Sequence, residues 1–95
     1  PYRFLGMRIK EGFRLRSVLG ESVVVGEGVN QINFSKIIAL NESAALLWQA
    51  IEGKEFSNED LANILVDIYE IDQETALRDA WEMTEEWKKQ GLLDD

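Results

Sequence analysis

The spacing of hydrophobic positions changes once along the chain, near residue 41. Before that point apolar and polar residues partly alternate, as in Phe13-Arg14-Leu15-Arg16, and β-branched residues gather at Val23–Val25. Partial alternation and β-branched residues are typical of half-buried strands. The pattern predicts three strands, at about residues 13–19, 22–25 and 32–39. Because short connections join antiparallel neighbours, we expect a meander whose first and third strands are the edges.

The two connections between these strands are rich in glycine. Leu19-Gly20-Glu21-Ser22 predicts a two-residue type II′ turn with Gly20 in its first central position. Gly26-Glu27-Gly28 resembles a phosphate-binding loop only superficially, because no lysine and no helix start follow it directly. We therefore interpret this second connection as an ordinary hairpin loop.

After residue 41 the apolar positions recur every three or four residues, which is the period of an amphipathic helix. The spacing predicts three helices, at about residues 42–52, 58–69 and 73–90. Asn41, Ser57 and Asp72 are the expected N-caps, while Gly53 and Gly91 are expected to end helices. The positions expected to face the core are Ala44, Leu47, Trp48, Ile51, Leu61, Ile64, Leu65, Ile68, Ala76, Ala80, Met83 and Trp87.

This order of elements predicts an α+β fold, a small antiparallel sheet followed by three helices. The 95 residues suffice for one domain, expected over residues 7–95, with residues 1–6 expected to be additional or disordered sequence. No run of apolar residues approaches the roughly 20 needed to span a membrane. We expect a cytoplasmic location and no membrane partner.

Composition excludes several kinds of chemistry. The chain has no cysteine and no histidine, so thiolate nucleophiles and histidine bases are absent. The carboxylates show no calcium-loop spacing, and Asp79 with Glu82 is typical of a solvated helix face. We therefore expect no catalytic residues, no metal and no cofactor.

Charge is distributed unevenly within the net charge of −8. Residues 1–40 carry six basic and three acidic residues, whereas residues 41–95 carry four basic and fifteen acidic ones. The acidic half would repel phosphate groups. We therefore expect no nucleic-acid partner.

Two apolar features allow either a structural or a functional interpretation. Trp81 lies off the core stripe of the last helix and forms a second strip with Leu77, joined by Thr84 and the stem of Lys88. This strip is either a wider buried face or the apolar floor of a groove. The run Ile37–Leu40 makes both faces of the third strand apolar near its end, so either helices cover both faces or one awaits a partner.

The segment Leu40-Asn41-Glu42-Ser43-Ala44-Ala45-Leu46-Leu47-Trp48 resembles a segment of PqqD-like proteins. The resemblance continues through Phe56-Ser57, Leu61–Tyr69, Asp79 and Gly91-Leu92, and covers about residues 8–93. The chain departs from the family pattern at Trp81 and Trp87, where aliphatic side chains are more common.

The resemblance implies a winged-helix-like RiPP recognition element, which binds the leader of a ribosomally synthesised precursor peptide and presents it to a modifying enzyme, often a radical SAM protein. In such domains the leader pairs with the third strand as an added strand and lies in a groove against the third helix. The corresponding edge residues here are Phe34, Ser35, Lys36, Ile37, Ile38 and Ala39. The expected helix wall consists of Leu77, Trp81 and Thr84, with Arg78 and Lys88 at its rim.

Other functions remain open beside this one. The same order of elements suits a protein–protein interaction module that binds no leader, and a homodimer also stays open. A DNA-binding regulator would use the last helix, where the acidic residues outnumber the basic ones: Glu74, Asp79, Glu82, Glu85 and Glu86 against Arg78, Lys88 and Lys89. A gel shift at low salt distinguishes this last alternative.

Overall fold

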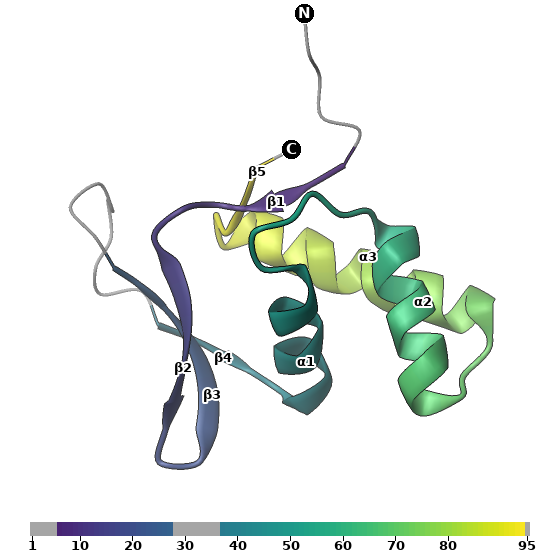
Figure 1. The fold of residues 1–95 in the computed structure, drawn as a ribbon, viewed down its shortest axis with the longest axis horizontal. Helices are drawn as coiled ribbons and strands as arrows, with labels where there is room; N and C mark the ends of the chain where they lie inside the picture. The colour runs from purple at the N-terminus through teal and green to yellow at the C-terminus, as the bar shows by residue number, and fades with distance from the viewer. Residues whose placement is uncertain (1–5, 28–36, 95) are drawn as a thin grey trace, which may run out of the picture. The chain divides into compact units, whose positions relative to one another are not determined.

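The computed structural model describes residues 6–27 and 37–94. The chain forms two compact units, one made of Lys10–Ala50 and the other of Pro1–Ile9 together with Ile51–Asp95. The first unit contains a three-stranded sheet and a helix, and the second contains two helices and a short pair of strands (Figure 1).

The sheet of the first unit is the expected antiparallel meander. It consists of β2 (Phe13–Val18), β3 (Glu21–Gly26) and β4 (Ile37–Leu40), in the order β2-β3-β4. The confirmed part of the third predicted strand is its end, since residues 32–36 lie outside the described residues. β3 is the central strand, and its Val24 is completely buried.

The turn between β2 and β3 differs from the expected type. Val18 pairs with Glu21, so the two loop residues are Leu19 and Gly20, with φ angles of 53° and 83°. Positive φ at both positions is the signature of a type I′ turn, and the type II′ prediction is wrong. The observed register places Leu15 opposite Val24, whereas the predicted turn would have placed Leu15 opposite Gly26. Cross-strand packing of apolar side chains therefore outweighs the cost of a left-handed leucine, about 1–2 kcal/mol.

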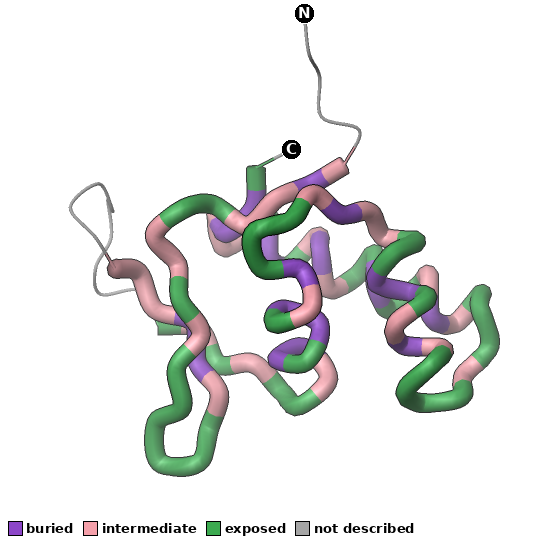
Figure 2. Tube along the Cα trace, viewed as in Figure 1, coloured by how far each residue is buried: buried purple, intermediate pink, exposed green. Residues whose placement is uncertain are grey.

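α1 (Glu42–Ile51) begins at the predicted cap. The Asn41 side-chain oxygen accepts a hydrogen bond from the Ala44 N–H at 2.8 Å. Leu47 and Trp48 are 1% and 0% exposed, as the apolar spacing predicts. Figure 2 shows buried and exposed positions alternating around this helix.

The second unit begins with a strand pair that the pattern did not predict. β1 (Arg8–Ile9) pairs antiparallel with β5 (Leu93–Asp94), and Met7 forms a bridge with Phe56. Strands of two residues are too short to produce a detectable alternation. The prediction for residues 1–6 falls mostly on residues 1–5, which lie outside the described residues.

α2 (Asn58–Tyr69) and α3 (Gln73–Lys89) have the predicted termini. Ser57 and Asp60 form both hydrogen bonds of a capping box, and Asp72 accepts the Thr75 N–H at 2.8 Å. After α3, Gly91 has a φ of 77° and the Leu92 N–H bonds the Trp87 carbonyl at 3.0 Å, which is a Schellman motif.

α2 and α3 pack along each other and form the core of this unit. Figure 2 shows their buried positions, which are Leu61, Ala62, Leu65, Ala76, Ala80, Thr84 and Trp87. One expected core residue, Ile68, is 48% exposed. The apolar period predicts on which face of the helix a residue lies. Whether another element packs against that face depends on residues elsewhere in the chain.

Candidate functional site

The outer edge of β4 is the first part of the candidate site. Among the described residues, β4 has β3 as its strand neighbour on one side and no strand on the other. Ile37 is 66% exposed and Ala39 is exposed, while Ile38 and Leu40 are half-buried. An edge strand presents unpaired backbone N–H and C=O groups, here beside exposed apolar side chains. The other expected edge residues, Phe34, Ser35 and Lys36, lie outside the described residues.

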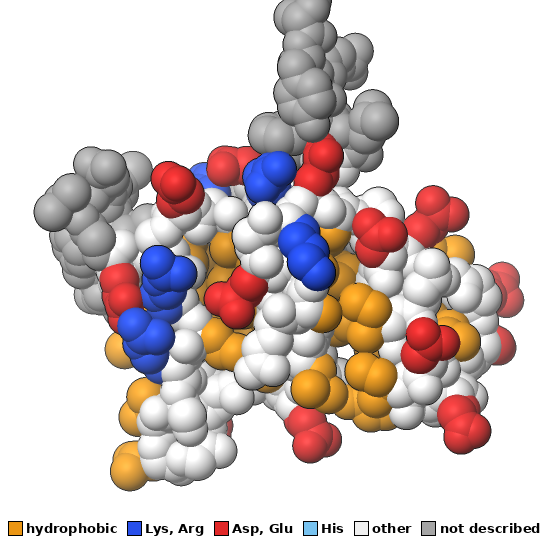
Figure 3. All heavy atoms as spheres, in the orientation of Figure 1, with side chains coloured by type: hydrophobic (Ala, Val, Ile, Leu, Met, Phe, Trp, Pro, Cys, Tyr) orange, Lys and Arg blue, Asp and Glu red, His pale blue; other side chains and the backbone are white. Residues whose placement is uncertain are grey.

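The exposed face of β4 continues across the sheet toward basic residues. Ile37 pairs with Val25 and Ala39 with Val23, and these two valines pair with Arg14 and Arg16 on β2. Since directly opposite residues share a face, this face changes from apolar at β4 to basic at β2. Figure 3 shows the basic side chains over β2. Arg16 forms an ion pair with Glu27 at 2.8 Å.

The second part of the expected site lies on α3, in the other unit. Trp81 is 56% exposed, Arg78 is exposed and Leu77 is half-buried. Leu77 and Trp81 are four residues apart and therefore lie on the same helix face. The exposure of Trp81 argues against the wider buried face and favours an apolar surface. Lys88 lies further along α3, with its Nζ 3.4 Å from a carboxylate oxygen of Glu85.

Thr84 does not belong to this exposed strip, which corrects the sequence prediction. Its side chain is completely buried, and its Oγ1 lies 2.8 Å from Asn58 Oδ1 and 3.1 Å from the Trp81 carbonyl oxygen. Thr84 lies four residues after Ala80 and three before Trp87, so it continues the core stripe. A threonine is accommodated there because its hydroxyl finds an acceptor. It anchors α3 to α2 below Trp81.

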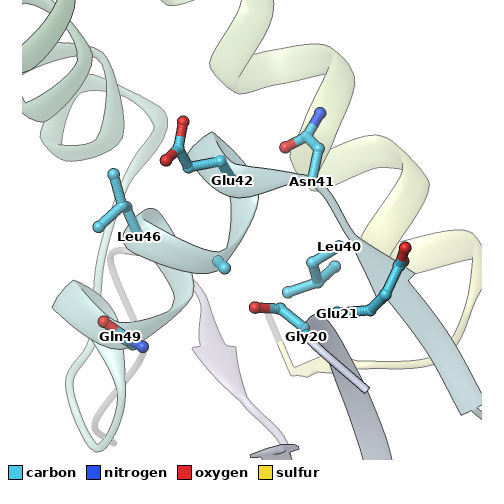
Figure 4. Close-up of a pocket in the computed structure, with 9 residues that line it drawn as sticks. Gly20, Glu21, Leu40, Asn41, Glu42, Leu46 and Gln49 are labelled. Atoms are coloured by element: carbon cyan, nitrogen blue, oxygen red, sulfur yellow. The ribbon is translucent and has the colours of Figure 1, made fainter. Parts of the chain in front are cut away.

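The first unit also contains an open pocket that the sequence pattern did not reveal. Its volume is about 480 Å³. In Figure 4, Leu46 and Gln49 on α1 lie on one side of it, and Gly20, Glu21 and Leu40 on the other. The pocket joins residues about 20 positions apart in the sequence, which only the β3–β4 pairing brings together. The hydrophobic period within one strand or helix cannot predict a pocket formed between separate elements.

Comparison with known proteins decides the family. The sequence model for coenzyme PQQ synthesis protein D (PqqD) matches residues 21–93. The chain is a member of the PqqD family. This confirms the resemblance of the segment around Leu40–Trp48.

The fold of this PqqD-family chain is also found in a solved structure described as lasso peptide synthetase B1 complexed with the leader peptide. The two chains superpose with a TM-score of 0.72 at 22% identity, covering 94% of this chain and 98% of the other. The likeness confirms the predicted α+β fold. No curated protein matches the chain.

Neither a metal centre nor a membrane span emerges from the part of the PqqD-family chain that the structure describes. Residues 6–27 and 37–94 hold no group of three or more carboxylates close enough to share an ion. No helix within these ranges is long and apolar enough to cross a membrane.

The pKa of Asp72 is lowered by hydrogen bonds from Thr75, with a smaller contribution from Arg78. Asp72 caps α3, so this perturbed pKa reflects a structural role.

Proposed function

We propose that the chain is a non-catalytic module that captures the leader of a ribosomally synthesised precursor peptide. The observation that carries this proposal is the free edge of β4 with Ile37 exposed beside it, in a chain of the PqqD family. A leader peptide bound to a protein of the same fold supports it. The lack of histidine and cysteine is consistent with binding rather than catalysis.

Capture would proceed by strand addition. A peptide lying antiparallel or parallel to β4 would satisfy the backbone groups on its outer side, which provides affinity without demanding one sequence. Alternate peptide side chains would then meet the face of Ile37 and Ala39. Phe34, Ser35 and Lys36 would extend the same edge, and Ile38 would support it from the opposite face.

Selectivity would come from α3. Leu77 and Trp81 would supply an apolar wall for the leader, and the buried Thr84 would hold this turn of α3 against α2 through its contact with Asn58. Arg78 and Lys88 would meet acidic leader residues at the rim. The wall is expected to matter more than the rim, because exposed ion pairs contribute only about 0–1 kcal/mol.

The bound leader would be presented to a modifying enzyme. A radical SAM protein is the partner enzyme that the family resemblance favours. The module itself would contribute affinity and position, so that the enzyme acts on the part of the precursor that follows the leader.

Hydrogen exchange tests the site directly. The probes are synthetic peptides covering the N-terminal half of each short reading frame found near the gene for this chain, each with a scrambled peptide of the same composition as its control. We expect protection along residues 34–39 and in the first half of α3. Protection confined to α2, or equal protection by the scrambled peptide, would contradict the proposal.

Backbone methylation of the peptide tests strand addition separately. In an added strand, alternate N–H groups point toward the edge and the others point away. We expect N-methylation at one set of alternate residues to abolish binding, and methylation at the other set to be tolerated. Equal tolerance at all positions would show that the peptide binds without joining the sheet.

A further inference from the structure

The tip of the β2–β3 hairpin carries apolar side chains in solvent. Leu19 is 99% exposed and the adjacent Val18 is 49% exposed. Figure 3 shows apolar side chains at this end of the hairpin. A side chain that is 99% exposed contributes nothing to the packing of its own chain.

The backbone conformation does not favour leucine at this position either. Leu19 has a φ of 53° and precedes Gly20 with a φ of 83°. Asparagine, aspartate and glycine are the residues suited to the first position of such a turn. Leu19 therefore serves neither the turn nor the core, which points to a contact outside the chain.

A pocket adjoins this tip. Gly20 and Glu21 follow Leu19 directly and line the pocket of about 480 Å³, whose apolar lining residues are Leu40, Ala45 and Leu46. Leu46 is itself 38% exposed. The acidic residues Glu21 and Glu42 also line the pocket, and Figure 4 shows both at its margin. The surface thus combines a projecting leucine with a mainly polar pocket that contains a small apolar patch and two carboxylates.

We propose that the hairpin tip and this pocket form the docking surface for the modifying enzyme. An apolar recess on the enzyme would receive Leu19, and a lysine or arginine beside that recess would enter the pocket between Glu21 and Glu42. The acidic border makes a basic protein surface the fitting partner and disfavours nucleic acid or an anionic membrane. The identity of the partner as the modifying enzyme rests on the proposed function.

The hairpin tip belongs to β2 and β3, and of the apolar pocket residues only Leu40 belongs to β4, at its end. The sheet order is β2-β3-β4, so β3 separates β2 from the free outer edge of β4. A peptide added to β4 would extend the sheet away from the β2–β3 loop. The hairpin tip therefore stays accessible when the edge is occupied.

The test replaces Leu19 with asparagine and measures three quantities. These are the melting temperature, the affinity for the leader peptide, and the affinity for the purified enzyme that modifies the captured precursor, measured by biolayer interferometry. Because asparagine suits the turn, Leu19→Asn is expected to melt at or above the temperature of the unmodified protein. Leader affinity should be unchanged, and enzyme affinity should fall about tenfold or more, as expected for a central apolar contact.

Two further variants sharpen the comparison. Ile68→Asn removes a 48% exposed apolar residue on α2, so it controls for a general loss of exposed apolar surface. It should leave enzyme affinity unchanged. Glu21→Lys should weaken enzyme binding mainly at low salt, because screening reduces an exposed ion pair.

Each other outcome is decisive. Unchanged enzyme affinity of a folded Leu19→Asn variant would overturn the proposal, as would equal losses for Leu19→Asn and Ile68→Asn. A dimer that Leu19→Asn converts to a monomer would assign the tip to a second copy of this chain and also overturn it. If no leader binds but the enzyme still binds through Leu19, the docking surface stands and the peptide-capture function fails.

Discussion

The hydroxyl of Thr84 on α3 lies 2.8 Å from the side-chain oxygen of Asn58 at the start of α2. Thr84 is completely buried, so this contact connects the two helices inside the second unit. The same hydroxyl lies 3.1 Å from the Trp81 carbonyl oxygen, so its single proton is shared between an acceptor on α2 and one on its own helix. Thr84, which the sequence predicted to touch the leader, is therefore a buried residue beneath the exposed Trp81.

Replacement of Thr84 by valine should lower the free energy of unfolding by about 1–3 kcal/mol, because Asn58 loses its donor within the packed unit. Thr84→Ser keeps the hydroxyl and serves as the matched control, with a smaller loss from the missing methyl group. Urea denaturation followed by circular dichroism measures both. Equal stability of Thr84→Val and the unmodified protein would show that the hydrogen bond contributes nothing.

The tryptophans of α3 should differ in their effect on stability. Trp87 is 2% exposed, so Trp87→Ala should cost about 3–5 kcal/mol through the cavity it leaves. Trp81 is 56% exposed, and Trp81→Ala should change stability by only about 0.5 kcal/mol. Thermal melts of the two variants test this contrast. A Trp87→Ala protein that melts within a few degrees of the unmodified one would contradict the assigned core.

Although Trp81→Ala should change stability little, it should strongly weaken binding of the leader peptide. Under the proposed function, Trp81→Ala weakens leader binding about tenfold or more, while Arg78→Ala weakens it only a few-fold as a rim charge. Isothermal titration with the leader peptide measures both affinities. A larger loss for Arg78→Ala than for Trp81→Ala would reverse the roles of wall and rim.

The cap of α3 should give stability a defined dependence on acid. Hydrogen bonds from Thr75, with Arg78 adding to them, hold the pKa of Asp72 below its ordinary value of 3.8. A lowered pKa in the folded state means that the stabilisation is complete above about pH 3.8 and is lost as pH falls through the lowered pKa.

Asp72→Asn keeps an N-capping side chain and removes the charge. The unmodified protein should therefore melt above this variant at pH 7, and the difference should shrink as pH falls below 3.8. Melting temperatures between pH 7 and pH 2 measure the effect. A difference that stays constant over this range would exclude the Asp72 charge as its source.

The elements of the fold could be read from local patterns. The caps at Asn41, Ser57 and Asp72 and the end of α3 at Gly91 depend on residues within one helical turn, so a single sequence contains them. The strand order of the meander followed from short connections in the same way. These predictions held because the interactions behind them act over a few residues.

The tertiary structure decided which surfaces are covered. It exposed Ile68, buried Thr84 against Asn58, and set the β2–β3 register by pairing Leu15 with Val24. It also paired the two-residue strands β1 and β5 across almost the whole length of the chain. Each of these depends on residues that are distant in sequence. Hydrophobic period alone predicts a direction for a side chain, and only the packed neighbours determine whether that direction leads to the core or to solvent.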